Sequence, residues 1–157
     1  MATINSVEYA KGVAVPVQSI DSVNKHAELR LASATLVSDG VLINGVTSGG
    51  ALGDTFNLFT IPAGARIVGF SIGFSGTPGA SHTFSIGIVG ALTAYRAAAV
   101  LPAGGQPGVI PAATWASAVL GVSGSSKLAT DTLIVATGAV VAMPAGTCVV
   151  TFVYACD

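Results

Sequence analysis

The sequence predicts an all-β protein built as a two-sheet sandwich, and three observations support that prediction. Apolar and polar residues alternate over several short stretches, which is the pattern of strands with one buried face. Proline and glycine punctuate these stretches, with 20 glycines and 7 prolines in the chain. A length of 157 residues suits one domain. We place this domain at residues 28–157, after an extended N-terminal arm at residues 1–27.

The predicted arm carries an alternating apolar run around Pro16. Because proline cannot donate a ladder hydrogen bond, this run fits an edge strand or an extended arm and not a central strand. We expect it to bind a partner by adding a strand to an exposed sheet edge; a disordered tail is the alternative. The side chains expected to make these contacts are Val13, Val15, Val17 and Ile20.

The domain begins with strands predicted at residues 28–37 and 54–61. Residues 66–89 have the clearest alternation, and we interpret them as a β-hairpin around a loop that contains glycine and proline. One face of this hairpin is apolar, so we expect it in the core together with Phe152 of the last strand. The predicted core face consists of Val68, Phe70, Ile72, Phe74, Phe84, Ile86 and Ile88.

The opposite face of the predicted hairpin carries mostly small residues. Glycine inside a strand packs nothing and is entropically unfavourable, so it often marks the close approach of another backbone. A solvated face would be expected to carry Thr, Lys or Glu instead. We predict that this strip lies against a second polypeptide; a water-facing sheet that tolerates small residues is the alternative. The strip consists of Gly69, Ser71, Gly73, Ser85 and Gly87.

Residues 91–101 are rich in alanine and are the only stretch that we predict as a helix. The next segment, residues 102–115, contains three prolines and is predicted as a loop. Strands are predicted again at residues 132–142 and 147–156. The single tryptophan, Trp115, lies at the end of the loop, where it would either anchor a protein interface or close one end of the core.

A short internal repeat supports the sandwich. Asp54 begins a strand that ends at a Pro-Ala-Gly turn at residues 62–64, and Asp131 begins another that leads to a second such turn at 144–146. Proline presets φ and glycine accepts a positive φ, which suits a tight turn. Two similar strand–turn–strand units are expected in a two-sheet sandwich. We expect both aspartates to accept hydrogen bonds from turn amides and to have no acid–base role.

The composition predicts a protein that associates with other proteins. Apolar residues make up 52% of the chain and charged residues only 8%, against about 25% charged residues in ordinary domains. A domain with so few charges tends to self-associate, so we expect much of its surface to be buried against partners. The net charge of −1 and the lack of a basic patch argue against nucleic acid as a partner.

The sequence gives no sign of a membrane or a secreted protein. No run approaches the roughly 18 apolar residues of a membrane helix. An outer-membrane barrel needs more strands and more aromatic residues than this chain offers, at 6% aromatic. The N-terminus lacks the layout of a signal peptide, so we expect synthesis and assembly in a cytoplasm.

No residue pattern predicts catalysis, a metal site or a cofactor. His26 and His82 have no partners at the spacing of a metal site or a catalytic triad. The carboxylates form no calcium-binding loop, and residues 48–54 lack the end of a phosphate-binding loop. Cys148 and Cys156 are expected in one strand, roughly 26 Å apart at about 3.3 Å per residue, which is beyond disulfide reach. We therefore predict a non-enzymatic protein.

The order of motifs carries a resemblance to a known family over roughly residues 28–155. Gly53-Asp54-Thr55 leads to Ile61-Pro62-Ala63-Gly64-Ala65-Arg66-Ile67, and an alternating segment and an alanine-rich stretch around Tyr95 follow. A second Asp-Thr-Leu at residues 131–133 leads to Pro-Ala-Gly-Thr-Cys-Val-Val at 144–150. This order resembles small structural proteins of tailed bacteriophages, in particular capsid decoration (cement) proteins.

The resemblance implies a jelly-roll-like antiparallel β-sandwich without catalytic residues. It implies a homotrimer on the outer face of the capsid, with the major capsid protein as partner and the virion as location. The predicted strip would then face either another copy or the shell. The resemblance implies nothing about residues 1–27.

Two other functions stay open at this point. The first is a different virion component, such as a head-fibre base, a neck protein or a tail subunit. The second is a carbohydrate-binding β-sandwich module, which would use exposed aromatic residues. Most aromatic residues alternate towards the predicted core, which leaves Tyr9, Tyr95 and Trp115 as candidates for a sugar site. A neighbouring major capsid gene would favour the decoration protein.

Overall fold

The computed structural model describes residues 3–5, 28–45, 53–107, 127–138 and 143–156. These residues form an all-β structure, and none of them lies in a helix. Most of the predicted arm lies outside these ranges, including Val13, Val15, Val17 and Ile20, and so does Trp115. The division at residue 27 and the roles of these side chains therefore stay predictions.

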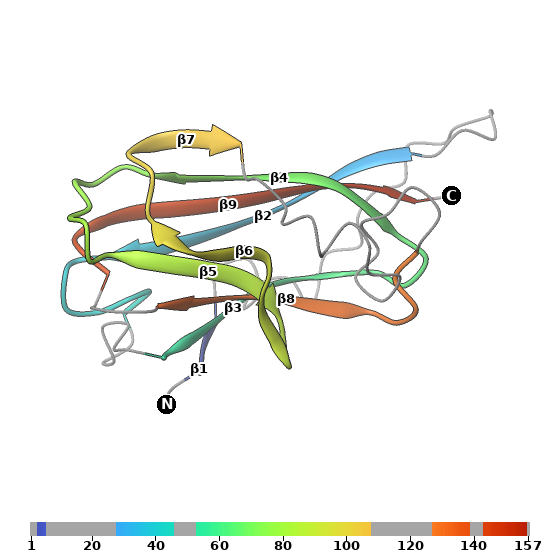
Figure 1. Cartoon of the computed structure of the whole chain (residues 1–157), viewed down its shortest axis with the longest axis horizontal. Helices are drawn as coiled ribbons and strands as arrows, with labels where there is room; N and C mark the ends of the chain where they lie inside the picture. Colours follow the sequence, from blue (N-terminus) through green and yellow to red (C-terminus); the bar gives the residue numbers. More distant parts are fainter. Residues whose placement is uncertain (1–2, 6–27, 46–52, 108–126, 139–142, 157) are drawn as a thin grey trace.

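Two sheets lie one above the other in Figure 1. The five-stranded sheet has the order β1-β3-β8-β5-β6 and the four-stranded sheet has the order β2-β9-β4-β7. All neighbouring strands are antiparallel except the short β1, which pairs with β3 in parallel. The strands of the five-stranded sheet are β1 (Thr3–Asn5), β3 (Thr55–Ile61), β8 (Thr132–Gly138), β5 (Thr83–Ile88) and β6 (Ala91–Val100). Those of the four-stranded sheet are β2 (Glu28–Ser38), β9 (Gly146–Cys156), β4 (Arg66–Phe74) and β7 (Gly104–Pro107).

The chain crosses between the sheets at almost every connection. Among the strands that the structure describes, β5 and β6 are the only consecutive pair in the same sheet. Eight strands, β2 to β9, arranged in two antiparallel sheets by repeated crossovers form a jelly roll. The predicted jelly-roll-like β-sandwich is thus confirmed, and the predicted strands at 28–37, 54–61 and 147–156 correspond to β2, β3 and β9.

The internal repeat marks two of these crossovers. The Pro-Ala-Gly turn at residues 62–64 leads from β3 in one sheet to β4 in the other, and the turn at 144–146 leads into β9. Gly64 and Gly146 both have positive φ, at 82° and 147°. Asp131 Oδ1 accepts a hydrogen bond of 2.9 Å from the amide of Ala63, as predicted for this aspartate. Asp54 is buried, and its predicted bond to a turn amide stays a prediction.

The predicted hairpin over residues 66–89 is wrong. β4 pairs with β9 and β7, whereas β5 pairs with β8 and β6 in the opposite sheet. The connection at residues 75–82 is longer than the about two to five residues of most hairpin loops, and it crosses from one sheet to the other. Alternation identifies a strand with one buried face, but it does not identify the neighbour of that strand.

The predicted helix at residues 91–101 is also wrong, because β6 occupies residues 91–100. A two-residue turn at Val89-Gly90 folds β6 back on β5, and Gly90 has a φ of 89°. The register between β5 and β6 shifts twice, and the Arg96 guanidinium donates to the carbonyls of Phe84, Ala99 and Val100 around these shifts. Strand pairing and this arginine outweigh the helix propensity of alanine, which is a weak preference.

The core lies between the sheets and is organised around Phe152 of β9. Its ring centroid lies 5.2 Å from that of Phe70, 5.3 Å from Tyr95 and 5.5 Å from Phe59. Phe70, Ile72, Phe84, Ile86 and Phe152 are all buried, which confirms this part of the predicted core.

Val68 departs from the predicted core face. A register shift between Ile67 and Gly69 turns Val68 outward, where it is 52% exposed, and brings Ile67 into the core instead. Such a bulge inserts one extra residue and breaks strict alternation, so the sequence pattern alone placed Val68 on the wrong side.

Candidate functional site: an uncharged sheet surface

The candidate site is the outward surface of the four-stranded sheet, on the side away from the core. We call it the outer face and define it by the outward residues of three neighbouring strands. β2 and β9 pair over eleven residues without a register shift, so their outward side chains form continuous rows. The outer face consists of Leu29, Leu31, Ser33, Thr35, Val37, Thr147, Val149, Thr151, Val153, Gly69, Ser71 and Gly73. None of these residues is charged. They are bordered at the start of β4 by the outward Val68 and by Arg66, a charged residue that is in register with Ala155 and, through it, with Leu29.

The register sorts these residues into rows that run across β2, β9 and β4. The middle row joins Ser33, Thr151 and Ser71, and the Ser33 and Thr151 hydroxyl oxygens lie 2.7 Å apart. The row on one side is Leu31–Val153–Gly69, and the row on the other is Thr35–Val149–Gly73. The middle row thus carries three hydroxyls, and in both flanking rows the residue on β4 is a glycine.

The predicted strip is divided between the two sheets. Gly69, Ser71 and Gly73 lie on β4 in the outer face, whereas Ser85 and Gly87 lie on β5 in the five-stranded sheet. Ser85 and Gly87 are buried within the chain itself. The five residues therefore do not form one surface, because the hairpin that would have joined them does not exist.

A side chain would meet different surroundings at Gly69 and at Gly87. A Cβ added to Gly87 would overlap the Ala91 carbonyl oxygen and approach the Leu92 carbonyl carbon to 2.5 Å, so the fold itself requires glycine there. A Cβ added to Gly69 meets no atom of the described residues within 4 Å, and Gly69 does not have a positive φ. Gly69 lies at the register shift that turns Val68 outward, and a glycine in a strand often marks such a bulge.

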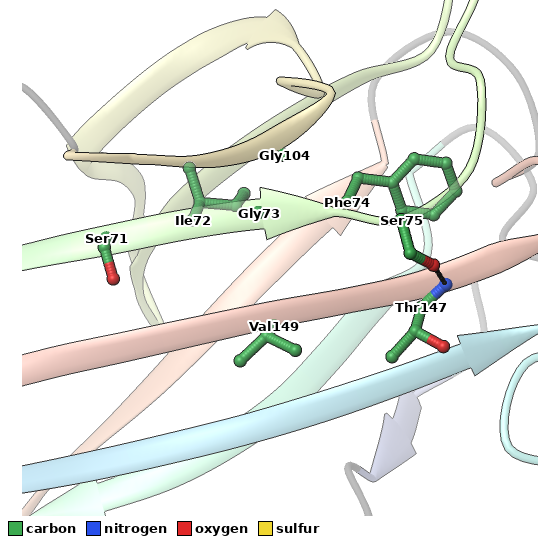
Figure 2. Close-up of a pocket in the computed structure, with 8 residues that line it drawn as sticks. All are labelled: Ser71, Ile72, Gly73, Phe74, Ser75, Gly104, Thr147 and Val149. Atoms are coloured by element: carbon green, nitrogen blue, oxygen red, sulfur yellow. Dashed lines mark hydrogen bonds between the residues drawn. The ribbon is translucent and has the colours of Figure 1, made fainter.

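A groove of about 350 Å³ opens on the outer face near the end of β4. Figure 2 shows Gly73 and Ser75 on one side, Thr147 and Val149 of β9 on the other, and Gly104 beside the start of β7. The Thr147 amide donates to Ser75 Oγ at 2.9 Å, and the Ser75 amide donates to the Thr147 carbonyl at 3.0 Å. These polar groups at the end of the groove are already bonded to each other, and the wall is largely apolar.

Edge strand β2 borders the outer face. It carries the most exposed large apolar side chains of that face, Leu29 at 67% and Leu31 at 69%. At its other end, the Val37 amide donates to Asn44 Oδ1 at 2.9 Å and the Val37 carbonyl accepts from the Asn44 amide at 2.8 Å. Sequence reasoning did not single out these leucines. The available signal was that both alternating halves of residues 28–37 are largely apolar, although only one half can face the core.

The described residues show no arrangement for chemistry. No group of three His, Cys, Asp or Glu side chains comes together among them. These residues also contain no helix that could span a membrane. The imidazole Nδ1 of His82 accepts from the Gly79 amide at 2.8 Å and so caps its own loop. Both cysteines are free, and burial raises the pKa of the Cys148 thiol to about 12. This thiol is therefore protonated and unreactive at neutral pH.

The fold is similar to that of chains in three phage capsid structures. A chain in the capsid of Ralstonia phage GP4 aligns with a TM-score of 0.63 and 15% identity, covering 99% of each chain. A chain of the cyanophage Pam1 capsid asymmetric unit aligns with a TM-score of 0.58 and 13% identity, covering 92% of this chain and 96% of that one. A chain of the acidic stable capsid of Helicobacter pylori bacteriophage KHP30 aligns with a TM-score of 0.53 and 14% identity, covering 83% and 89%.

No protein-family model matches the chain, and no curated protein matches it. At identities of 13–15% the structural likeness shows a shared fold. That fold spans nearly the whole of this chain in the alignment with the Ralstonia phage chain.

Proposed function

We propose that the protein is a structural component of a bacteriophage virion. In this proposal it binds the outer surface of the capsid as a decoration (cement) protein, forms a homotrimer, and has the major capsid protein as its partner. It assembles in the host cytoplasm, needs no cofactor and catalyses no reaction.

The outer face is the observation that carries this proposal. Twelve neighbouring residues on three strands are all uncharged, with hydroxyl and apolar side chains, and the nearest charged residue in register is Arg66 at the start of β4. Interface cores are depleted of charged residues in the same way. The three capsid chains of the same fold support a virion as the setting.

The proposal is tested by adding the purified full chain to empty shells of the major capsid protein encoded in the same genome. Sedimentation should recover the chain with the shells, and electron cryomicroscopy should show added density on their outer surface. Density confined to a neck or a tail would instead support the second candidate, a different virion component. Failure to bind any part of the particle would overturn the proposal.

A pair of matched variants tests the outer face itself. Thr151→Arg introduces a charge in the middle row of the outer face, whereas Thr93→Arg introduces the same charge at an exposed position on β6. Surface substitutions usually change the free energy of unfolding by about 0.5 kcal/mol or less, so both variants should fold. Thr151→Arg should lose shell binding because it buries an unpaired charge, and Thr93→Arg should keep it. Equal binding by the two variants would remove the outer face from the contact.

A further inference from the structure

The edges of the two sheets differ in how well they are protected against pairing with another chain. Among the described strands, edge strands β1 and β7 have only three and four residues, and β7 ends at Pro107. Edge strand β6 carries two register shifts. Short length, proline and bulges are devices with which proteins protect sheet edges. Edge strand β2 has none of these three, since it has eleven residues, contains no proline and pairs with β9 without a shift.

The backbone on the open side of β2 lacks partners near the start of the strand. The Val37 amide and carbonyl both bond to Asn44, on the side away from β9. Because alternate residues of a strand direct these groups to the same side, the amides and carbonyls of Leu29, Leu31 and Ser33 also point away from β9. Among the described residues, none bonds to these groups of Leu29, Leu31 and Ser33 on the open side.

This open edge has the chemistry that an extended polypeptide segment needs. A strand added there would satisfy the backbone groups of three alternate residues, and it would cover Leu29 and Leu31, which are 67% and 69% exposed. The two charged residues of β2, Glu28 and Arg30, alternate with these leucines and bond to each other at 2.6 Å. They therefore present no net charge to an incoming strand. The segment that fits is uncharged and has apolar side chains beside the leucines.

We infer that an extended segment of the major capsid protein adds a strand to the four-stranded sheet beside residues 29–33 of β2. Main-chain hydrogen bonds hold such a strand in place, and pockets for its alternate side chains select it. The inference rests on the proposed function and deepens it, because it identifies how the shell protein is bound and which form of the shell protein is recognised.

The length of the open edge favours the shell protein over a second copy of this chain. Five residues at about 3.3 Å each give an edge of roughly 17 Å that is one strand wide. A standard interface of about 800 Å² per partner covers a patch roughly 28 Å across in both directions. A second copy held by this edge alone would therefore have too small a contact. The shell protein, in contrast, also contacts the outer face, to which Leu29 and Leu31 belong.

Hydrogen–deuterium exchange of the full chain, free and bound to shells of the major capsid protein, tests the pairing at single residues. In the free chain the amides of Leu29, Leu31 and Ser33 should exchange fast, whereas the amides between them, which bond to β9, should exchange slowly. On the shells the three fast amides should slow by at least about a hundredfold. The amide of Val89, which is 71% exposed at the turn between β5 and β6, should exchange equally fast in both states.

Two variants of Leu31 separate the backbone from the side chain. Leu31→Pro and Leu31→Val both leave three side-chain carbons, but only proline removes the amide hydrogen. Proline is tolerated in an edge strand where the amide faces outward. Leu31→Val should bind shells within about threefold of the wild type, and Leu31→Pro should bind at least about tenfold more weakly. Circular dichroism checks the fold of both, and if Leu31→Pro does not fold, the exchange of the wild type decides.

Sedimentation of the same samples with shells keeps this inference apart from the proposed function. Binding to shells without slowed exchange at Leu29, Leu31 and Ser33 would overturn the inference and leave the proposed function intact. Slowed exchange of these amides in the free chain, increasing with its concentration, would show a second copy on the edge and would also overturn the inference. A chain that does not bind shells would overturn the proposed function, and the inference with it.

Discussion

The outer surfaces of the two sheets differ although both contain glycines and small residues on their central strands. On the five-stranded sheet, Ser85 and Gly87 are buried, and the backbone of Ala91 and Leu92 at the start of β6 leaves no room for a side chain at Gly87. On the four-stranded sheet, a Cβ at Gly69 would enter open space, and Ser71 beside it is exposed. The same residue types are thus enclosed by the chain itself in one sheet and border open space in the other.

This difference indicates that glycine occupies strand positions 69 and 87 for two different reasons. Glycine at position 87 avoids a clash with the backbone of Leu92 within the chain. Glycine at position 69 lies at a β-bulge and avoids no clash among the described residues. We predict that it also allows the close approach of a second polypeptide, and the following predictions test whether the two positions behave differently.

The largest effect is expected in the core that both sheets share. Phe152→Ala should lower the free energy of unfolding by about 3 to 5 kcal/mol, because it removes a fully buried ring that contacts three other aromatic rings. Urea denaturation followed by tryptophan fluorescence and circular dichroism measures this loss. A loss below about 1 kcal/mol would show that the two sheets do not pack through Phe152.

Gly87→Val should destabilise the fold by about 1 to 3 kcal/mol or more. The added side chain meets backbone atoms of Ala91 and Leu92, which cannot move without breaking the β5–β6 pairing. The same denaturation experiment measures the change, with Gly69→Val as the control at a position with open space. Equal losses for the two variants would mean that the two sheet surfaces do not differ as the structure indicates.

The sequence predicted most of the buried side chains of β4 and β5, but not that these two strands lie in different sheets. The alternation around Phe70 and Phe84 correctly placed both side chains in the core, because a strand with one buried face has a period of two. The sequence could not show that their strands lie in different sheets, because pairing depends on residues far away in the chain. The strip was therefore predicted as one surface, but two of its five residues, Ser85 and Gly87, are buried.

The misassigned helix has a similar cause. Alanine-rich residues favour a helix locally, but the Val89-Gly90 turn and the bonds of Arg96 to strand carbonyls fix residues 91–100 as β6. The groove was also beyond the sequence, because it depends on β7 lying beside β4. The low content of charged residues, in contrast, was visible in the sequence, although it does not say which surface lacks them.

The buried thiol of Cys148, on the inward side of β9, should make the stability depend on pH. Burial raises the pKa of Cys148 from 9.0 to about 12, so the folded state holds this proton where the unfolded state loses it. Stability is therefore highest below pH 9 and falls as the pH rises towards 12, by roughly 1 kcal/mol at pH 10. Denaturation at pH 7 and pH 10 measures this change, and Cys148→Ala should show a smaller drop. Burial also raises the pKa of Tyr95. Its ionisation therefore also lowers the stability at high pH, and this part of the loss remains in Cys148→Ala.

The smallest effect on the fold, and the most informative for the contact, is expected from Gly69→Val. The side chain enters open space from a strand, where valine is favoured over glycine by up to about 1 kcal/mol. The free energy of unfolding should therefore stay the same or rise slightly. Against a closely packed second polypeptide, however, the same side chain would occupy the space of the partner, and shell binding or trimer formation should weaken by at least tenfold. Val68→Ala, at the neighbouring exposed position on β4, is the control for a change in apolar surface without added bulk. If Gly69→Val is both as stable as the wild type and equally able to assemble, then glycine at this position has no role in contact, and the outer face near the bulge is water-facing.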